Sequence, residues 1–420
     1  MSKIISFFLT LIIFSGVNNA QPEMPRLLYS NIIQFSSDST ENVYYTYKIP
    51  LNHLVFEKEA DLFLAQYRIS VEVFNADNQK FITRAIKEKN IQVPDYKQTM
   101  SPLIFSEGVL KLDLSPGTYS MMEILYDSKS DRELKLPPHT IKIDPAKTLA
   151  TPFIINDRTV ECNDRKLPVL ANYGGDLPFD ENRYTFIFPV KGDKTDSLFV
   201  NVIQAADTLF NGILLNPEKD RISLNECGGK ILLETDTSKK DYNIFRIEGL
   251  STKISEGAFR INVSEDPNFS KSERYSATCR WIDKPESLRD PELAIKALKF
   301  IESDSVISSL LEGDDENYPA NLTEYWKKID PSPGTEFNPL MQEFYNRIDY
   351  AAKNFTSIGG SNGANTDRGK IYIKFGKPVE VNRTSDNYGN IIETWTYNNP
   401  QRKFVFVDKK GTGDFSLISG

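Results

Sequence analysis

The sequence predicts a mainly β protein, in which two antiparallel, immunoglobulin-like β-sandwich domains precede a C-terminal α+β module of helices packed on an antiparallel β-meander. Three observations support this fold class. Short runs of β-branched and aromatic residues, separated by turns, fill the chain from about residue 42 to residue 283. Helical periodicity begins only after Trp281, and alternating strands return towards the C-terminus.

The domain boundaries are expected where the composition changes. We assign residues 1–20 to a signal peptide, 21–147 and 148–284 to the two sandwich domains, and 285–420 to the C-terminal module. A chain of 420 residues has room for about three domains that each bury a core of their own.

The first residues have the pattern of a secretory signal peptide. Lys3 precedes an apolar run from Ile4 to Val17, and the polar Gln21 follows Ala20. This run is shorter than the roughly 20 apolar residues that a membrane-spanning helix needs, so we expect a mature chain without a transmembrane segment. The expected location is the periplasm or the outer membrane surface, or outside the cell after secretion.

The charge of the chain argues against nucleic acid as a partner. The formal net charge is -8, and no basic run is present to bind phosphates. We therefore expect the partners to be other proteins of the cell envelope.

Cysteine and histidine are scarce. Cys162, Cys227 and Cys279 could form one disulfide in an oxidising compartment, with the pairing left open, or they could be buried thiols of a β core. No CxxC spacing exists, and the two histidines, His53 and His139, lie outside the cysteine region. Neither a metal nor another cofactor is expected.

Two groups of short strands define the expected sandwiches. The clearest strands of the first domain are residues 43–50, 62–74, 109–114 and 118–127, and those of the second are 184–190, 197–203, 230–234 and 258–263.

The C-terminal module should begin with helices. Helical signals cover Pro285–Leu311, Leu322–Ile329 and Pro339–Phe355. The expected sheet then consists of residues 370–375, 391–397, 402–408 and 414–418, with Ile371, Ile373 and Phe375 alternating onto one face of the first strand.

Four ordered segments in the last third of the chain resemble the GWxTD domain, a family of exported bacterial proteins without an established reaction. They are Tyr325–Thr335, Glu343–Ile348, Thr366–Pro378 and Glu393–Tyr397. The motif residues that match are Gly363, Thr366, Asp367, Gly369, Gly376 and Pro378. The resemblance implies a fold and a compartment, but no chemistry.

One position departs from the family pattern, because Ala364 stands where the family name has tryptophan. Any structural role of that tryptophan must be met here by other packing. The order of helices, Gly-x-Pro turn and Trp-x-Tyr strand is also similar, in pattern only, to small outer-membrane lipoproteins of the barrel-assembly machinery, which bind proteins.

The candidate site residues lie around the Thr-Asp-Arg-Gly turn. Arg368 is expected to pair with Asp330, Asp349 or Asp367 across the seam between helices and sheet. A polar binding cleft would use the same residues, with Arg347 and Trp326 beside them. No catalytic residue is assigned, because the C-terminal module has no histidine to act as general base.

The expected function is therefore that of a non-enzymatic, exported envelope protein that acts as an interaction or scaffold module. The alternative is a carbohydrate-binding protein or a carboxylate-dependent glycan hydrolase. In that case Asp367, Glu393 and Asp408 would supply acid and base, and Trp395 and Tyr397 would stack on a sugar.

Overall fold

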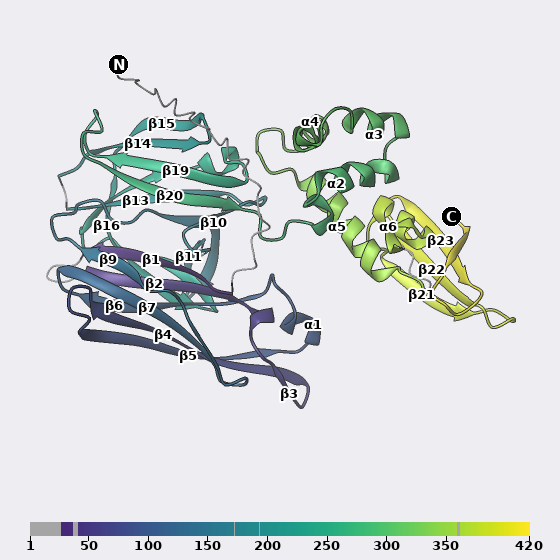
Figure 1. Ribbon diagram of the computed structural model, residues 1–420, viewed down its shortest axis with the longest axis horizontal. Helices are drawn as coiled ribbons and strands as arrows, with labels where there is room; N and C mark the ends of the chain where they lie inside the picture. The colour runs from purple at the N-terminus through teal and green to yellow at the C-terminus, as the bar shows by residue number, and fades with distance from the viewer. Residues whose placement is uncertain (1–26, 37–40, 172, 193, 359–361) are drawn as a thin grey trace, which may run out of the picture.

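The computed structural model describes residues 27–36, 41–171, 173–192, 194–358 and 362–420. The expected signal peptide, residues 1–20, lies outside these ranges. Strands form the larger part of the molecule, and the helices with a final small sheet extend from one side of it (Figure 1). The mainly β class and the C-terminal helices followed by an antiparallel meander are confirmed.

The first β region consists of two sheets that share one core. One sheet has the strand order β1-β2-β6, and the other contains β3, β4, β5, β7, β8 and β9. The bounds are β1 Tyr29–Ser36, β2 Glu41–Pro50, β3 Glu57–Glu59, β4 Leu62–Asn75, β5 Phe81–Val93, β6 Phe105–Leu114, β7 Gly117–Asp127, β8 Arg132–Lys135 and β9 His139–Ile143, with short helical turns η1 Leu51–His53 and α1 Tyr96–Thr99. Alternation along β2 and β4 brings Tyr45, Tyr47 and Tyr67 into the shared core.

The β1-β2-β6 sheet is buried on its other face as well. Phe35 of β1 and Tyr44 of β2 pack with Phe153 and Ile187 of the second β region, in a separate hydrophobic cluster. The ring centroids of Phe35 and Phe153 lie 5.7 Å apart. The two β regions therefore meet through a packed core, which fixes one against the other.

The second β region contains a six-stranded closed barrel and a five-stranded sheet. The barrel has the order β10-β11-β17-β16-β18-β13, and the sheet the order β12-β20-β19-β14-β15. The bounds are β10 Phe153–Cys162, β11 Arg165–Leu170, β12 Leu177–Pro178, β13 Tyr184–Lys191, β14 Ser197–Gln204, β15 Asp207–Leu215, β16 Glu218–Cys227, β17 Lys230–Asp236, β18 Tyr242–Ile247, β19 Gly257–Ser264 and β20 Ser272–Arg280, with η2 Leu250–Lys253.

A disulfide joins Cys162 to Cys227 in this barrel. These residues end β10 and β16, so the bond ties two hairpins beside β11 and β17, whose register comprises the single pair Val169–Leu232. The disulfide thus reinforces the least paired seam of the barrel. Cys279 is a buried free thiol, and burial raises its pKa.

The helical part follows β20 without a break in the core. Its elements are η3 Glu286–Leu288, α2 Pro291–Ala297, η4 Leu298–Phe300, α3 Asp304–Leu310, η5 Asp315–Asn317, α4 Tyr318–Lys328, α5 Pro339–Asn354, η6 Gly363–Asn365 and α6 Asp367–Phe375. One hydrophobic cluster runs from the five-stranded sheet through these helices to the last strands. Phe344, Tyr345 and Ile348 provide the apolar face of α5, as their spacing predicts.

The final sheet has the order β21-β22-β23-β24, with bounds Glu380–Ser385, Ile391–Asn398, Gln401–Asp408 and Ser416–Ser419. The expected strands near residues 391, 402 and 414 are present. Strand β21 was not expected, because all of its side chains are exposed and its sequence has no apolar pattern.

The prediction of a strand at residues 370–375 was wrong, because these residues belong to helix α6. The side chain of Thr366 accepts a hydrogen bond from Gly369 N at 3.1 Å, which is an N-cap. Burial then follows a helical spacing, with Arg368, Gly369, Tyr372 and Ile373 inside. Among the described residues, no helix is long and apolar enough to cross a membrane.

Candidate functional site

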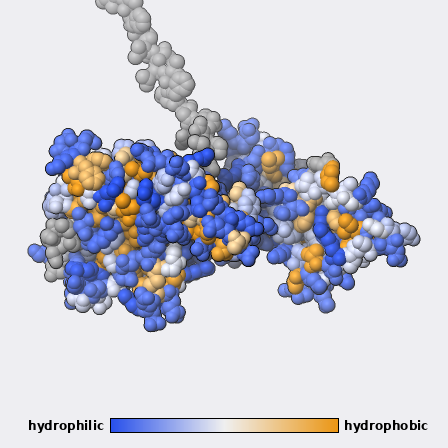
Figure 2. Space-filling view, turned by 90° about the horizontal axis from the view of Figure 1, so that it is seen from below, coloured by the Kyte–Doolittle hydropathy of each residue, from blue (hydrophilic) through white to orange (hydrophobic). Residues whose placement is uncertain are grey.

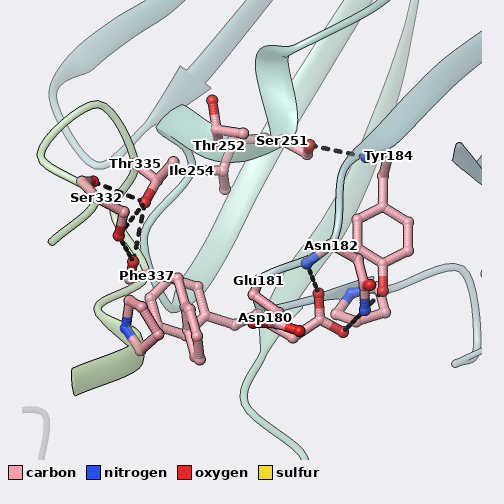
Figure 3. Close-up of a pocket in the computed structure, with 13 residues that line it drawn as sticks. Asp180, Glu181, Asn182, Tyr184, Ser251, Thr252, Ile254, Ser332, Thr335 and Phe337 are labelled. Carbon is pink, nitrogen blue, oxygen red and sulfur yellow. Dashed lines mark hydrogen bonds between the residues drawn. The ribbon is translucent and has the colours of Figure 1, made fainter. Parts of the chain in front are cut away.

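A pocket of about 210 Å³ lies where the loop between α4 and α5 meets the second β region (Figure 3). Three separate segments line it. They contribute Pro178, Phe179, Asp180, Glu181, Asn182 and Tyr184 from β12 to the start of β13, Ser251, Thr252 and Ile254 from η2 and the residue after it, and Ser332, Thr335, Phe337 and Pro339 from the α4–α5 loop and the first residue of α5. We call it the junction pocket.

Three aromatic rings form a firm support at one end of the junction pocket. The ring centroid of Phe179 lies 5.3 Å from that of Trp281 and 5.3 Å from that of Phe337. The rings of Trp281 and Phe337 are 5.7 Å apart, and all three pairs meet edge to face. Because the rings come from three segments, their packing sets the relative position of the pocket walls.

A carboxylate is fixed next to Phe179 in the sequence. Asp180 accepts hydrogen bonds from Asn182 N at 2.8 Å, from Asn182 Nδ2 at 2.9 Å and from the Tyr184 hydroxyl at 2.9 Å. Burial, and next the charge of Asp180, raise the pKa of Tyr184, so this hydroxyl stays protonated and donates. Glu181 follows with an exposed side chain.

The α4–α5 loop owes its shape to Asp330. The carboxylate accepts from Ser332 N at 2.7 Å and from Ser332 Oγ at 2.9 Å. The Thr335 hydroxyl donates to the carbonyl of Phe337 at 2.9 Å, and Ser332 Oγ lies 3.2 Å from the same carbonyl oxygen. Pro331 and Pro333 restrict the backbone further. This segment is part of the family resemblance, and it forms a preorganised wall.

Hydrogen bonds clamp the same loop to the second β region. Glu336 N donates to the carbonyl of Thr252 at 2.8 Å, and the Ser255 hydroxyl donates to the Glu336 carboxylate at 2.9 Å. Behind the loop, Asn338 Nδ2 donates to the carbonyl of Trp326 at 3.0 Å. Trp326 itself is buried, so it supports the loop and is not a wall of the pocket.

A second hollow, of about 190 Å³, shares Pro178, Phe179 and Asp180 with the junction pocket. It adds Asp283, whose carboxylate accepts from Gln342 Nε2 at 2.6 Å. Burial raises the pKa of Asp283. Asp180, Glu181 and Asp283 together give this junction an acidic rim.

Arg368 has a structural partner that the sequence did not reveal. Its guanidinium lies 3.4 Å from the carboxylate of Glu393, donates to the carbonyl of Gly413 at 3.1 Å, and covers the ring of Phe415 at 4.0 Å. The expected pairing with Asp330, Asp349 or Asp367 was wrong, because each of those carboxylates has other partners.

Those partners place the remaining candidates at separate points. Asp367 accepts from Leu417 N at 3.0 Å, and Asp349 accepts from Glu286 N at 2.6 Å and Ser287 N at 3.0 Å. Arg347 pairs with Glu343 at 2.6 Å and donates to the carbonyl of Ile373 at 3.3 Å. The Arg347–Glu343 pair lies within α5, and each of the other contacts joins two elements of the C-terminal part. The structure does not bring these side chains into one cleft.

The carboxylates proposed for glycan hydrolysis also have internal roles. Glu393 is buried, and it binds Arg383 at 2.6 Å and Trp395 Nε1 at 2.8 Å in addition to Arg368. Asp408 accepts from the backbone N–H groups of Lys410, Thr412 and Gly413, which holds the turn after β23. Trp395 and Tyr397 are core residues.

The glycines of the motif permit close backbone contacts. A Cβ atom on Gly363 would lie 2.3 Å from the carbonyl oxygen of Ala351, and one on Gly369 would lie 2.0 Å from the carbonyl oxygen of Gly363. Neither neighbour is a flexible side chain. These two glycines therefore let α5, η6 and α6 cross at a distance that other residues do not allow.

The residues that build the junction pocket were largely missed from the sequence. Only Asp330 and Trp326 were candidates, and both act behind the wall. Phe179, Asp180 and Ser251 come from a different domain, and no local motif marks them. In the part of the chain that the structure describes, no group of three or more His, Cys, Asp or Glu residues is placed to hold a metal ion.

Comparison with known proteins concerns mainly the C-terminal part. No curated protein matches the chain. Among solved structures, the chain is similar to the C-terminal domain of the Streptococcus pyogenes antigen I/II-family protein AspA, with 6% identity, 61% of this chain and 98% of that chain covered, and a TM-score of 0.18. A score this low carries no structural argument.

The family model of the GWxTD domain matches residues 269–417. The match begins just before β20, earlier than the boundary expected at residue 285, and it includes Trp281 and the α4–α5 loop. The junction pocket thus lies between this domain and the preceding β region. Residues 269–417 of the chain are a GWxTD domain.

Proposed function

We propose that the protein is an exported, non-enzymatic component of the cell envelope, and that its GWxTD domain and second β region together bind another envelope protein. The observation that carries this proposal is the junction pocket. Its aromatic support, its fixed loop and its acidic rim are held by internal contacts in the unbound chain, so a partner would meet a site that is already formed.

The chemistry of the pocket suggests what it receives. A single apolar side chain suits a hollow of about 210 Å³ with aromatic rings at one end. The rim carboxylates of Asp180, Glu181 and Asp283 favour a basic residue next to that side chain. The proposed ligand is thus a protein segment with an apolar anchor beside lysine or arginine.

The location proposed for this interaction is the periplasm, the outer membrane surface, or the outside of the cell. The pattern of residues 1–20 supports export, and the Cys162–Cys227 disulfide supports folding in an oxidising compartment. We further propose that the first β region is an elaborated immunoglobulin-like sandwich, and that both β regions hold the GWxTD domain at a set distance.

Binding by variants of the full mature chain tests the proposal. Thr252→Trp would fill the junction pocket, and Glu181→Lys would reverse the charge of its rim. Glu59→Lys makes the same charge change on β3, where Glu59 is 58% exposed, and is the matched control. Envelope proteins would be crosslinked in cells, recovered with each variant and quantified by mass spectrometry.

The proposal expects one set of envelope proteins that the wild type and Glu59→Lys both retain and that both pocket variants lose. Equal retention by all four chains would remove the junction pocket as the binding site. Circular dichroism on each variant shows that the fold is intact.

Carbohydrate binding is the second candidate function. It is favoured by the combination of aromatic rings with the hydroxyls of Ser251, Thr252 and Thr335 in a pocket of this size. Titration calorimetry with wall-glycan fragments distinguishes the two. Binding of a glycan that Thr252→Trp abolishes would favour this candidate over the protein partner.

A further inference from the structure

Strand β5 has one edge without a partner strand. Within the described residues it pairs only with β4, and β6 pairs only with β2. A groove of about 600 Å³ runs between these two edges, lined by Thr83–Lys87 and Val109–Asp113. Lys87 Nζ and Lys89 Nζ donate to carbonyls of β6, at Val109 and Glu107, so side chains of β5, and not a further strand, satisfy these two carbonyls.

The outer face of β5 carries an ordered set of side chains. Arg84 lies opposite Glu72 of β4 with 3.6 Å between the charged groups, and Glu88 lies opposite Arg68 with 4.0 Å between them. Ile86 stands between the two pairs and is 46% exposed. Figure 2 is seen from the side on which β4 and β5 lie, and it shows hydrophobic patches among hydrophilic residues.

Residues of opposite charge lie at equal distances on the two sides of Ile86. Arg84 lies two residues before it and Glu88 two residues after it. We propose that two copies of the chain associate by antiparallel pairing of β5 with β5, centred on Ile86. The two sheets then continue across a two-fold axis, as in an isologous dimer.

The pairing produces two charge ladders with alternating signs. Arg84 of one copy lies opposite Glu88 of the other, so each ladder runs Glu72, Arg84, then Glu88 and Arg68 of the second copy. The second ladder is its symmetry equivalent. Between them, the exposed Ile86 side chains cover each other, and both copies lose an exposed apolar residue.

Other registers are less favourable. Side chains alternate between the two faces of a strand. The two-fold axis must therefore pass through a residue, and not between two residues, if side chains of the same face are to lie opposite each other. A centre at Lys87 would place Lys87 opposite its own copy, and a centre at Ala85 would place Arg84 opposite Ile86. The inward-pointing Lys87 and Lys89 already bind Glu226 at 2.6 Å each, so they stay neutralised when Ile86 is the centre.

The contact is a single strand edge, so we expect a dimer of micromolar affinity. Sedimentation velocity of the full mature chain, labelled at trace level and titrated with unlabelled chain, measures the dissociation constant. Arg84→Glu and Glu88→Arg each create two like-charge contacts, and each is expected to raise the constant by about tenfold or more.

Mixing the two variants is the decisive test of the Arg84–Glu88 contacts. In a heterodimer, the new glutamate of one chain faces the new arginine of the other, and the unchanged Glu88 faces the unchanged Arg84. The equimolar mixture should therefore recover the wild-type constant within about threefold. Because neither chain changes on mixing, a folding defect cannot imitate this recovery. Arg165→Glu, at an exposed position on β11, is the control and should leave the constant unchanged.

Three results would overturn the inference. They are a wild-type chain that stays monomeric to about 100 µM, a dimer that neither charge variant weakens, and a mixture that does not recover. If the chain stays monomeric and its β5 amides are protected from hydrogen exchange only when another protein is bound, the edge pairs with that protein and not with a second copy of the chain. None of these results bears on the junction pocket, which lies on other elements.

Discussion

The guanidinium of Arg368 lies 3.4 Å from the carboxylate of Glu393, and this buried pair connects helix α6 to strand β22. Arg368 follows directly after the Thr-Asp of the family motif and is buried. This arginine holds helix and sheet together, which leaves the junction pocket, on other elements, as the candidate site for binding.

Removal of Arg368 should unfold the GWxTD domain more easily. Arg368→Ala leaves Glu393 buried with one exposed partner, Arg383, and should lower the free energy of unfolding by about 3 kcal/mol. Lys403→Ala is the control, because Lys403 is exposed on β23, and it should cost less than about 0.5 kcal/mol. Tryptophan fluorescence during urea unfolding reports on this domain, since all three tryptophans, Trp281, Trp326 and Trp395, belong to it. Equal effects of the two variants would contradict the assignment.

The close backbone contacts of the motif predict a strong effect at Gly369. Gly369→Ala places a methyl group against the carbonyl of Gly363 and should destabilise the domain by about 3 kcal/mol. Gly334→Ala is the matched control, because a Cβ atom there meets nothing within 4 Å, and it should change stability by less than about 0.5 kcal/mol. Thermal unfolding of both variants gives the comparison, and a Gly369→Ala chain as stable as the control would contradict the close crossing of α6 and η6.

The disulfide should stabilise the barrel substantially. Closing a loop with a sequence separation of 65 residues corresponds to about 4 kcal/mol in the chain-entropy model. The Cys162→Ser/Cys227→Ser chain should unfold at a lower urea concentration than the wild type and should no longer respond to reductant. Cys279→Ala, which removes the free thiol, should keep the response to reductant. A reductant effect that persists without Cys162 and Cys227 would contradict this.

A buried lysine predicts the pH dependence of stability. Lys48 lies between the two β regions, within 3.9 Å of the Glu107 carboxylate, and burial lowers its pKa from 10.5 to about 8. Between these values the unfolded chain binds more protons than the folded chain, so the free energy of unfolding rises with pH. We expect Lys48 to contribute a gain of about 2 kcal/mol from pH 8 to about pH 9.5, while the ionisation of tyrosines in the unfolded chain opposes this gain near the upper end of the interval.

Lys48→Met is the control for that gain. The variant has no proton to lose at this position and keeps every tyrosine, so the free energy of unfolding of the wild type minus that of the variant isolates the contribution of Lys48 and should rise over the same pH interval. Denaturation by urea, followed by circular dichroism at several pH values, measures both chains. A difference between the two chains that does not grow from pH 8 to about pH 9.5 would contradict the role of Lys48.

The sequence predicted elements with strong local patterns and missed those that depend on their surroundings. Helix α5 was predicted because its apolar residues recur at helical spacing. Helix α6 was mistaken for a strand, because Ile371, Ile373 and Phe375 alternate as in a strand. The N-cap at Thr366 is the local signal that favours the helix. Strand β5 was overlooked because charged residues recur along it, and their partners lie on the separate strands β4 and β16.

The site was harder to predict than the fold. Asp330 and Trp326 were singled out through the family segments, but the pocket that they support also needs Phe179 and Asp180, far away in sequence. Likewise, the partner of Arg368 was expected among nearby aspartates and is Glu393, on a strand. Long-range packing decides these contacts, and no local pattern in the sequence shows which distant segments meet.

Photocrosslinking from inside the junction pocket is the most direct test of whether this pocket binds another protein. Benzoylphenylalanine would replace Thr252, which lines the pocket, or Thr384, which is exposed on β21, in the full chain expressed in its own cells. We expect one crosslinked envelope protein from position 252 and no such product from position 384. The crosslinked segment of that protein should contain an apolar residue beside lysine or arginine. The absence of a specific product at 252, or the same product from both positions, would contradict the assignment of the pocket as a protein-binding site.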